Sequence, residues 1–380
     1  MKPLHFLLPF LLSLFAFNAQ ANTQMLVPEA PRVDARSHTL IDYDSGRVLA
    51  ESNADERMEP ASLTKLMTAY VVFNELRSGQ IKLSDKVRVS KKAWRTPGSR
   101  MFIEVDHLVD VESLLKGMII QSGNDASVAL AEYVAGSEEV FAALMNEHAQ
   151  RLGLYGSHFT NSTGLPDPDH YTSAKDMATL AVRMIRDFPE YYHWYSEKDY
   201  TYGKITQGNR NLLLYRDKTV DGLKTGHTDS AGYCLVVSAL RNDMRLISVV
   251  MGTKSESARA NESQKLLNYG FRFFETHKLY DAVEPLKSVR VWKGASDAVA
   301  LGMGKAFYTT VPRGQYNKLN VTVSTGGKLV APIKKGQTLG QINVHLGDTL
   351  LAEHPLIALD DVAEGSLFQR LLDSVKMLWQ

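Results

Sequence analysis

Ser62 and Lys65, two side chains that could act together as a nucleophile and its base, stand three residues apart in "EPASLTKLMTAYVV", residues 59–72. Residues i and i+3 of a helix share a face, so a serine in the first turn can lie within hydrogen-bond reach of the lysine. A lysine whose pKa is lowered can take the proton of a serine hydroxyl, which then attacks an acyl carbon. The pair alone is weak evidence, because roughly one or two Ser-x-x-Lys matches arise by chance in such a chain. Ser113–Lys116 is a second match.

Two further short motifs contain side chains that could complete such a site. Ser122-Gly123-Asn124 stands between two predicted helices, where the glycine relieves the turn and both polar side chains can point into one cleft. Lys224-Thr225-Gly226 lies on a predicted strand and offers a cation, a hydroxyl donor and a residue without a Cβ atom. Ser113 precedes Ser122 within one predicted helical stretch, so the two side chains can hardly converge, whereas Ser62 comes from a separate helix. Ser62 is therefore the better candidate nucleophile.

The elements that must position these residues follow from the spacing of apolar side chains. Residues 38–50 are typical of a hairpin, residues 61–188 have mostly helical spacing, and residues 161–178 include a long polar loop. Residues 220–252 change to three consecutive strand patterns, and a helix over 263–277 follows. This order predicts an α+β fold, with helices against a sheet whose outer strands come from opposite ends of the segment.

The C-terminal part of the chain has a different pattern of apolar and polar residues. Short alternating segments between Gly and Pro turns predict a second, β-rich domain over 281–362, after a first domain over 22–280. Residues 363–380 predict an amphipathic helix, with Leu367, Phe368, Leu371, Leu372, Val375, Leu378 and Trp379 on one face. Such a helix can pack on the β-rich domain, but it also suits the membrane interface, and we expect it to anchor the protein there. It is too short and too charged to span a bilayer.

The first 21 residues are typical of a secretory signal peptide. Met1-Lys2 is followed by an apolar run over 6–17 and by Ala19-Gln20-Ala21, a small-x-small cleavage pattern. We therefore expect the mature chain to begin near Asn22, outside the cytoplasm.

Composition narrows the possible partners. The formal net charge is +1 and no run of Lys or Arg occurs, so nothing indicates a nucleic-acid partner. The single cysteine, Cys234, excludes an intrachain disulfide, and its strand-like surroundings favour a small buried apolar residue over a catalytic thiol.

In the order S-x-x-K, S-x-N and K-T-G, the three motifs form the serine acyl-transferase set of penicillin-binding proteins and serine β-lactamases. The whole chain resembles the low-molecular-weight penicillin-binding proteins, the D-alanyl-D-alanine carboxypeptidases of the type-5/type-6 kind. The resemblance is carried by "ASLTKLMTAY", "QSGNDASVALAE", "VDGLKTGHTDSAGYCLV", "MRLISVVMG" and "KLLNYGFRFFET". It implies the penicillin-recognising peptidase fold, a bacterial periplasmic location at the inner membrane, and no metal or organic cofactor.

The resemblance also implies how the acyl group is transferred. Ser62 would attack the penultimate D-Ala carbonyl of a peptidoglycan pentapeptide ending in D-Ala-D-Ala, and Lys65 would take its proton. Ser122, between Lys65 and Lys224, would relay a proton to the leaving D-alanine. Asn124 would hold the substrate amide and help to orient Lys65. β-Lactam antibiotics would acylate the same serine.

Other matching residues would bind the substrate. The backbone N–H groups of Ser62 and His227 would form the oxyanion hole, next to Gly226 on the same strand. Thr225 would bind the terminal carboxylate, and Arg210 and Arg259 match positions that support the cleft, although each could also be a surface arginine.

Two features depart from the family pattern. Thr163 in "NSTGLPD" stands where many relatives carry a histidine, which puts in doubt the share of this loop in deacylation. The spacing before Lys224 is one residue shorter, which weakens the assignment of Arg210.

Three alternative functions share some of these motifs. A serine β-lactamase of class A needs a glutamate between the second and third motifs, and residues 151–189 contain none. A β-lactam sensor domain should carry spanning helices, and no apolar run of that length follows the signal peptide. An endopeptidase that cuts D-Ala to diaminopimelate cross-links would use the same acyl half of the substrate, and the motifs do not exclude it.

Overall fold

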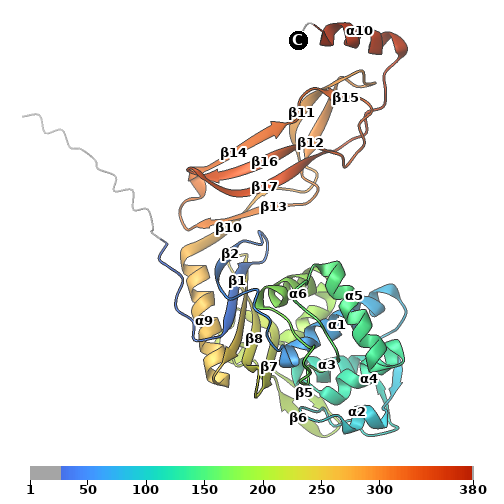
Figure 1. Ribbon diagram of the computed structural model, residues 1–380, viewed down its shortest axis with the longest axis vertical. Coiled ribbons are helices and arrows are strands. Elements are labelled where there is room, and N and C mark those ends of the chain that lie inside the picture. Colours follow the sequence, from blue (N-terminus) through green and yellow to red (C-terminus); the bar gives the residue numbers. More distant parts are fainter. Residues whose placement is uncertain (1–26, 379–380) are drawn as a thin grey trace, which may run out of the picture.

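An α+β unit is followed by a β-rich unit and a terminal helix (Figure 1). The computed structural model describes residues 27–378, so the predicted signal peptide at 1–21 lies outside the described residues. The predicted α+β fold class is confirmed.

The first unit is built on a five-stranded antiparallel sheet. In spatial order its strands are β2 (Val48–Ser52), β1 (Ser37–Asp42), β9 (Met244–Thr253), β8 (Gly232–Arg241) and β7 (Val220–Thr228). The predicted hairpin at 38–50 and the three predicted strands over 220–252 are confirmed. The outer strands β2 and β7 come from opposite ends of the first unit, as predicted. Because β7 lies at the edge of the sheet, the K-T-G motif is on an edge strand.

Helices cover both faces of this sheet (Figure 1). The helices of this unit are α1 (Thr64–Ser78), α2 (Lys91–Arg95), α3 (Val111–Ile120), α4 (Asn124–Ala135), α5 (Glu138–Leu152), α6 (Ala174–Asp187), α7 (Pro189–Tyr192), α8 (Leu213–Arg216) and α9 (Glu256–Phe273). Short hairpins pair β3 (Lys86–Arg88) with β4 (Leu108–Asp110) and β5 (Asp199–Tyr202) with β6 (Ile205–Gly208), and 3₁₀ turns form η1 (Ala61–Leu63) and η2 (His193–Ser196). Because strand side chains alternate, Cys234 and Val236 of β8 face the helical layer while Leu235 and Val237 face α9.

Helix α1 is more deeply buried than its sequence indicates. The apolar residues Leu63, Leu66, Met67 and Tyr70 account for the burial of one side of the helix. In the structure every residue from Thr64 to Phe73 is buried, because α3, α4, α5 and α6 surround the helix. The polar side chains of its first turn therefore lie in the interior and need partners there.

The predicted helix over 263–277 begins and ends elsewhere. Helix α9 starts at Glu256, after an N-cap in which the Ser255 side chain accepts from the Ala258 N–H group, and it ends at Phe273. Residues 274–277 belong instead to β10 (Phe274–Tyr280), which pairs with β13 (Phe307–Pro312). Strand pairing with a distant segment overrides the local helical spacing here.

The β-rich unit contains a six-stranded sheet beside the β10–β13 pair. In order its strands are β14 (Leu319–Thr325), β16 (Thr338–Leu346), β17 (Thr349–Ala358), β12 (Ala298–Gly302), β11 (Pro285–Trp292) and β15 (Leu329–Val330), and Tyr316–Lys318 forms the 3₁₀ turn η3. Hydrogen bonds join the β10–β13 pair to the first unit. Thr276 donates to Asp42 Oδ2 at 2.6 Å, and Arg47 Nη1 donates to the Thr310 carbonyl at 2.5 Å.

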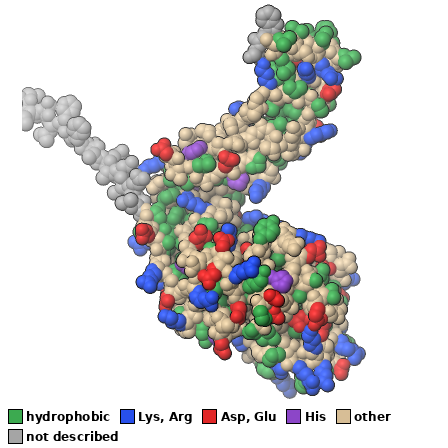
Figure 2. Space-filling view, in the orientation of Figure 1, with side chains coloured by type: hydrophobic (Ala, Val, Ile, Leu, Met, Phe, Trp, Pro, Cys, Tyr) green, Lys and Arg blue, Asp and Glu red, His purple; other side chains and the backbone are tan. Residues whose placement is uncertain are grey.

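The terminal helix α10 (Leu367–Met377) turns its polar side to the β-rich unit. Asp373 is its buried residue, and Asp373 Oδ2 accepts from the backbone N–H of Lys293 at 2.6 Å. The apolar side chains are exposed, with Leu367 at 83% and Phe368 at 73%, and hydrophobic side chains gather over this end of the molecule (Figure 2). The apolar face of α10 thus does not pack on the β-rich unit, while Trp379 lies outside the described residues.

Candidate active site

Ser62 and Lys65 meet at the start of α1. Ser62 lies in the 3₁₀ turn η1, Lys65 lies in the first turn of α1, and Lys65 Nζ is 3.1 Å from Ser62 Oγ. Ala61, just before the serine, has φ of +46°, a conformation that residues with a Cβ atom rarely adopt. The predicted nucleophile and base are therefore within hydrogen-bond distance.

Two fixed carbonyl groups accept hydrogen bonds from Lys65. Its Nζ atom is 2.6 Å from Asn124 Oδ1 and 2.7 Å from the backbone carbonyl oxygen of Thr163. The side chain is 1% exposed. Burial, together with the charge of Arg210, lowers the pKa of Lys65 from its ordinary value to about 7. A substantial fraction of this lysine is thus neutral near pH 7.

The Ser122–Asn124 motif forms the junction between α3 and α4. Ser122 has φ of +74°, so the chain turns sharply there between the two helices. Asn124 Nδ2 donates to the Pro97 carbonyl at 2.6 Å, which leaves Oδ1 for Lys65. A Cβ atom at Gly98 would lie 2.7 Å from Asn124 Nδ2, so glycine is needed where this segment passes.

The K-T-G motif on β7 provides a second lysine beside the second serine. Lys224 Nζ lies 3.0 Å from Ser122 Oγ and 3.1 Å from the Thr225 carbonyl oxygen. Burial lowers the pKa of Lys224 well below its ordinary value, and the nearby Lys65 acts in the same direction. A Cβ atom at Gly226 would lie 2.9 Å from the Pro60 carbonyl oxygen, so glycine lets β7 approach the turn that carries Ser62.

A cleft of about 400 Å³ opens over these residues. All the predicted site residues line it except Lys65 and Lys224, which lie beneath its surface: Ser62, Ser122, Asn124, Arg210, Thr225, Gly226, His227 and Arg259. Arg259 is buried on α9 and its Nη1 atom donates to the Gly226 carbonyl at 3.2 Å. The structure brings all ten predicted residues to one place, and Arg210 and Arg259 both border the cleft.

The second Ser-x-x-Lys match lies outside this cleft. The Ser113 N–H group donates to Asp110 Oδ1 at the start of α3, and Lys116 Nζ pairs with Glu112 at 2.8 Å. Neither residue lines the cleft. Ser113 and Lys116 are thus explained by the capping and surface charge of α3.

Several contributions to the site could not be found from side-chain motifs. The Thr163 carbonyl that holds Lys65 is a backbone group, while the Thr163 hydroxyl bonds to Asn161 Oδ1 within its own loop at 2.9 Å. Asp125 is buried and accepts from the N–H groups of Met101, Phe102 and Ile103, which fixes the segment after Gly98 on α4. "GND" in the second motif is the one signal that pointed toward Asp125.

Two further observations concern possible metal ligands and the single cysteine. Between residues 27 and 378 no group of three or more His, Cys, Asp and Glu side chains could hold a metal ion. Cys234 is buried, and burial raises the pKa of its thiol to about 11, which is unlike a reactive thiolate.

Comparison with known proteins agrees with this geometry. Residues 24–255 match the D-alanyl-D-alanine carboxypeptidase family, and residues 274–364 match the C-terminal domain of penicillin-binding protein 5. The D-alanyl-D-alanine carboxypeptidase DacC of Escherichia coli (strain K12) is 49% identical, over 96% of this chain and 93% of that protein. Penicillin-binding protein 5 from Haemophilus influenzae has a similar structure, with a TM-score of 0.86 and 42% identity over 89% of this chain and 100% of that chain.

A smaller relative matches only part of the chain. Penicillin-binding protein D2 from Listeria monocytogenes, solved in its ampicillin-bound form, has a TM-score of 0.59 and 29% identity over 63% of this chain and 100% of that chain. Fold and motifs together define a serine acyl-transferase of the penicillin-binding class. The chain belongs to the D-alanyl-D-alanine carboxypeptidase family, and it is a serine-type peptidase. Relatives named carboxypeptidases match nearly the whole chain, which favours this class over a β-lactamase or a sensor domain.

Proposed function

We propose that this chain removes the terminal D-alanine from peptidoglycan stem peptides that end in D-Ala-D-Ala, through an acyl-enzyme on Ser62. The proposal rests above all on Lys65, which is buried, has a lowered pKa and lies 3.1 Å from Ser62 Oγ. Lys65 serves as the general base for Ser62.

The partners of Lys65 suit it to accept a proton from one direction. A neutral amine has two N–H groups and one lone pair, whereas a lysine ammonium has three N–H groups and no lone pair. The carbonyl oxygens of Asn124 and Thr163 can accept both N–H groups of the neutral form. The lone pair is then free to accept the hydroxyl proton of Ser62. The Ser62 oxygen attacks the penultimate D-Ala carbonyl as its proton leaves.

Ser122 and Lys224 serve the leaving group. When the peptide bond breaks, the departing D-alanine nitrogen needs a proton. The Ser122 hydroxyl can donate its own and be replenished with the proton that Lys65 took from Ser62, which returns Lys65 to its neutral form. Lys224, at 3.0 Å, holds the Ser122 hydroxyl in place for this relay. Ser62 then carries the acyl group as an ester, which water hydrolyses. Asn124, at the edge of the cleft, holds the substrate amide.

The positive charge around the cleft favours a substrate that ends in a carboxylate. Arg210 and Arg259 border the cleft, and Thr225 presents its hydroxyl there on β7. We assign the terminal carboxylate to Thr225 with support from the two arginines. The N–H groups of Ser62 and His227 stabilise the oxyanion, for which each donor typically contributes about 10²–10³ in rate.

The same serine reacts with β-lactams. A β-lactam presents an acyl group and a carboxylate in the arrangement of the substrate terminus, and the ampicillin-bound relative from Listeria supports this assignment. The loop over 161–178 contains no glutamate, and Glu138, which reaches that loop from α5, does not line the cleft. We therefore expect slow release of the acylated form rather than rapid antibiotic turnover.

The exposed face of α10 supports attachment to a membrane surface. Its apolar side chains lie in solvent while Asp373 ties its other side to the β-rich unit. Among residues 27–378 no helix is both long and apolar enough to cross a bilayer. We propose that the exported chain binds the periplasmic face of the inner membrane through this helix, lying in the interface.

The decisive experiment measures D-alanine release from a peptide ending in D-Ala-D-Ala, together with the mass of penicillin-treated protein. Wild type should release D-alanine and carry one penicilloyl group, Ser62→Ala should do neither, and the matched control Ser113→Ala should behave as wild type. Stable acylation at Ser62 without D-alanine release would point to a sensor, or to an endopeptidase that needs cross-linked substrate. Rapid penicillin hydrolysis without peptide cleavage would identify a β-lactamase.

A further inference from the structure

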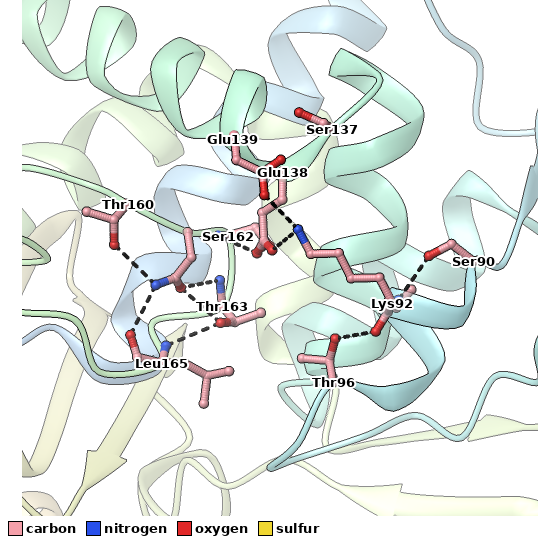
Figure 3. A network of polar contacts seen from close by, with 12 residues as sticks. Ser90, Lys92, Thr96, Ser137, Glu138, Glu139, Thr160, Ser162, Thr163 and Leu165 are labelled. Atoms are coloured by element: carbon pink, nitrogen blue, oxygen red, sulfur yellow. Dashed lines mark hydrogen bonds and ion pairs between the residues drawn. The ribbon is translucent and has the colours of Figure 1, made fainter.

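An ion pair outside the cleft joins the two chain segments that hold Lys65. Lys92 on α2 pairs with Glu138 Oε2 at 3.1 Å and with Glu139 Oε1 at 3.0 Å, both at the start of α5 (Figure 3). The two carboxylates differ in their surroundings, because the side chain of Glu138 is 12% exposed and that of Glu139 is 75% exposed. Glu138 is thus the one of the two carboxylates that is shielded from solvent, although the Lys92 side chain is 47% exposed.

Glu138 also reaches the loop that follows α5. Its Oε1 atom accepts from the Ser162 N–H group at 3.1 Å and from the Ser162 hydroxyl at 2.7 Å. The Ser162 carbonyl in turn accepts from Thr68 Oγ1 on α1 at 2.7 Å. Ser162 is therefore fixed on both sides, and the next carbonyl along the chain, that of Thr163, is the one that accepts from Lys65.

The loop itself leaves the Thr163 carbonyl little freedom. Asn161 Oδ1 accepts from the N–H groups of Thr163 and Gly164, and Asn161 Nδ2 donates to the Leu165 carbonyl. At Gly164, where φ is +81°, a Cβ atom would overlap the carbonyl oxygen of Ala61. Asn161 gives the loop its shape, whereas Glu138 sets where the loop sits relative to α1.

Lys92 belongs to the segment that holds the other acceptor of Lys65. Helix α2 ends at Arg95, and the Pro97 carbonyl that follows accepts from Asn124 Nδ2, whose Oδ1 atom accepts from Lys65. The Lys92–Glu138 ion pair thus links the segment that holds Asn124 to the loop that contains Thr163, and these two residues supply the carbonyl groups that accept from Lys65.

We propose that Glu138, held by Lys92, is a positioning residue for Lys65: it fixes the Ser162–Thr163 peptide so that the amine keeps its lone pair directed at Ser62. This inference rests on the proposed function, since it assigns Lys65 the role of base. Glu138 touches neither the cleft nor the reacting atoms, and it acts through Ser162, Thr163 and the charge it places near Lys65.

Because Glu138 is charged, its removal should shift the pKa of Lys65 in a definite direction, which removal of an uncharged contact would not do. Among the charged groups near Lys65, Arg210 opposes its protonation, whereas Asp125 and Glu138 favour it. Lys224, whose own pKa is lowered, and neutral His170 also lie nearby. Removal of the Glu138 charge should lower the pKa of Lys65, so the acid limb of kcat/KM should move to lower pH. Removal of the Lys92 charge should move that limb to higher pH.

Four variants of the full chain test the proposal by D-alanine release across a range of pH. Glu138→Ala should lower kcat by about tenfold with little change in KM, because a displaced base slows the chemical step. Glu138→Gln, whose amide oxygen can still accept from Ser162, should recover most of that loss while the acid limb lies at lower pH than in wild type. Lys92→Gln should move the limb the opposite way. Glu139→Gln, which loses only an exposed charge, is the matched control and should match wild type.

The outcomes separate the possible failures. If wild type releases no D-alanine, the proposed function fails and not merely this inference. If wild type is active and folded Glu138→Ala has the same kcat and pH profile, Glu138 does not position Lys65. Equal losses in Glu138→Ala and Glu139→Gln would show that the ion pairs only stabilise the fold. If Glu138→Ala fails to fold, Glu138→Gln and Lys92→Gln decide, and shifts in the same direction would overturn the proposal.

Discussion

Around the cleft, the ionisable side chains of Lys65 and Lys224 are buried, whereas at the far end of the molecule the large apolar side chains of α10 face solvent (Figure 2). Both arrangements run against the usual distribution, in which charges lie outside and apolar groups inside. A buried lysine lowers stability because its charged form is poorly solvated, and an exposed apolar face gains nothing from burial. Each arrangement is therefore explained by what the region binds or does, and not by stability of the fold.

The two regions also differ in how tightly they are specified. At the cleft, Gly226, Gly164 and Gly98 each lie where a Cβ atom would meet a neighbour closer than real contacts allow. On the exposed face of α10 no close neighbour sets the identity of each residue, and only the pattern of apolar residues matters. Substitutions should accordingly have large effects at the cleft and graded effects on α10.

The largest effect is expected from Lys65→Arg. A guanidinium remains charged at any pH that the protein tolerates, so it cannot take the proton of Ser62. We expect kcat for D-alanine release to fall by about 10³-fold, within the range of a lost general base. Activity within tenfold of wild type, in a protein that folds normally, would show that Lys65 is not the base.

Gly226→Ala tests the close approach of β7 to the nucleophile. The new Cβ atom would lie 2.9 Å from the Pro60 carbonyl oxygen, so either β7 or the turn carrying Ser62 must move. We expect about a 10²-fold loss of kcat/KM, since small displacements of reacting groups are costly. Gly326→Ala is the matched control, because nothing lies within 4 Å of a Cβ atom there. Equal activity of the two variants would contradict the account.

Leu371→Asp tests the other side of the comparison. Leu371 is 66% exposed on α10, and a charge there opposes insertion of the apolar face into an interface. We expect binding to vesicles of phosphatidylethanolamine and phosphatidylglycerol to fall by about tenfold, with D-alanine release from a soluble peptide unchanged. The control is Leu350→Asp, which places the same charge at a 49% exposed leucine of the β-rich unit. Equal binding by both variants would mean that α10 does not contact the membrane.

Much of the molecule could be predicted from its sequence because the signals were local. Strand-like patterns located β7, β8 and β9, and the three motifs located the two serines and two lysines of the site together with Asn124 and Thr225. The order of the motifs also separated Ser62 from Ser113. Sequence patterns were sufficient here because two motifs stand at the beginnings of helices and the third lies within strand β7, so the local structure of each motif could be predicted.

Other features could not be read from the chain because they depend on tertiary contacts. The Thr163 carbonyl has no side-chain signal, and Glu138 reaches Ser162 only because α5 and the following loop fold together. Helix α9 ends at Phe273 because the next residues pair with β13, a strand far along the sequence. The complete burial of α1 likewise reflects the helices around it, which no window of its own sequence contains.

The protonation state of Lys65 is the central claim, and its titration tests that claim most directly. Protein labelled with ¹³C at the lysine Cε atoms can be followed by NMR against pH, with Lys65→Met to assign the signal. The account predicts a midpoint near pH 7, well below that of an ordinary lysine, matched by an acid limb of kcat/KM at the same pH. A Lys65 signal that titrates near pH 10 would contradict it, because the amine would then be protonated when the enzyme acts.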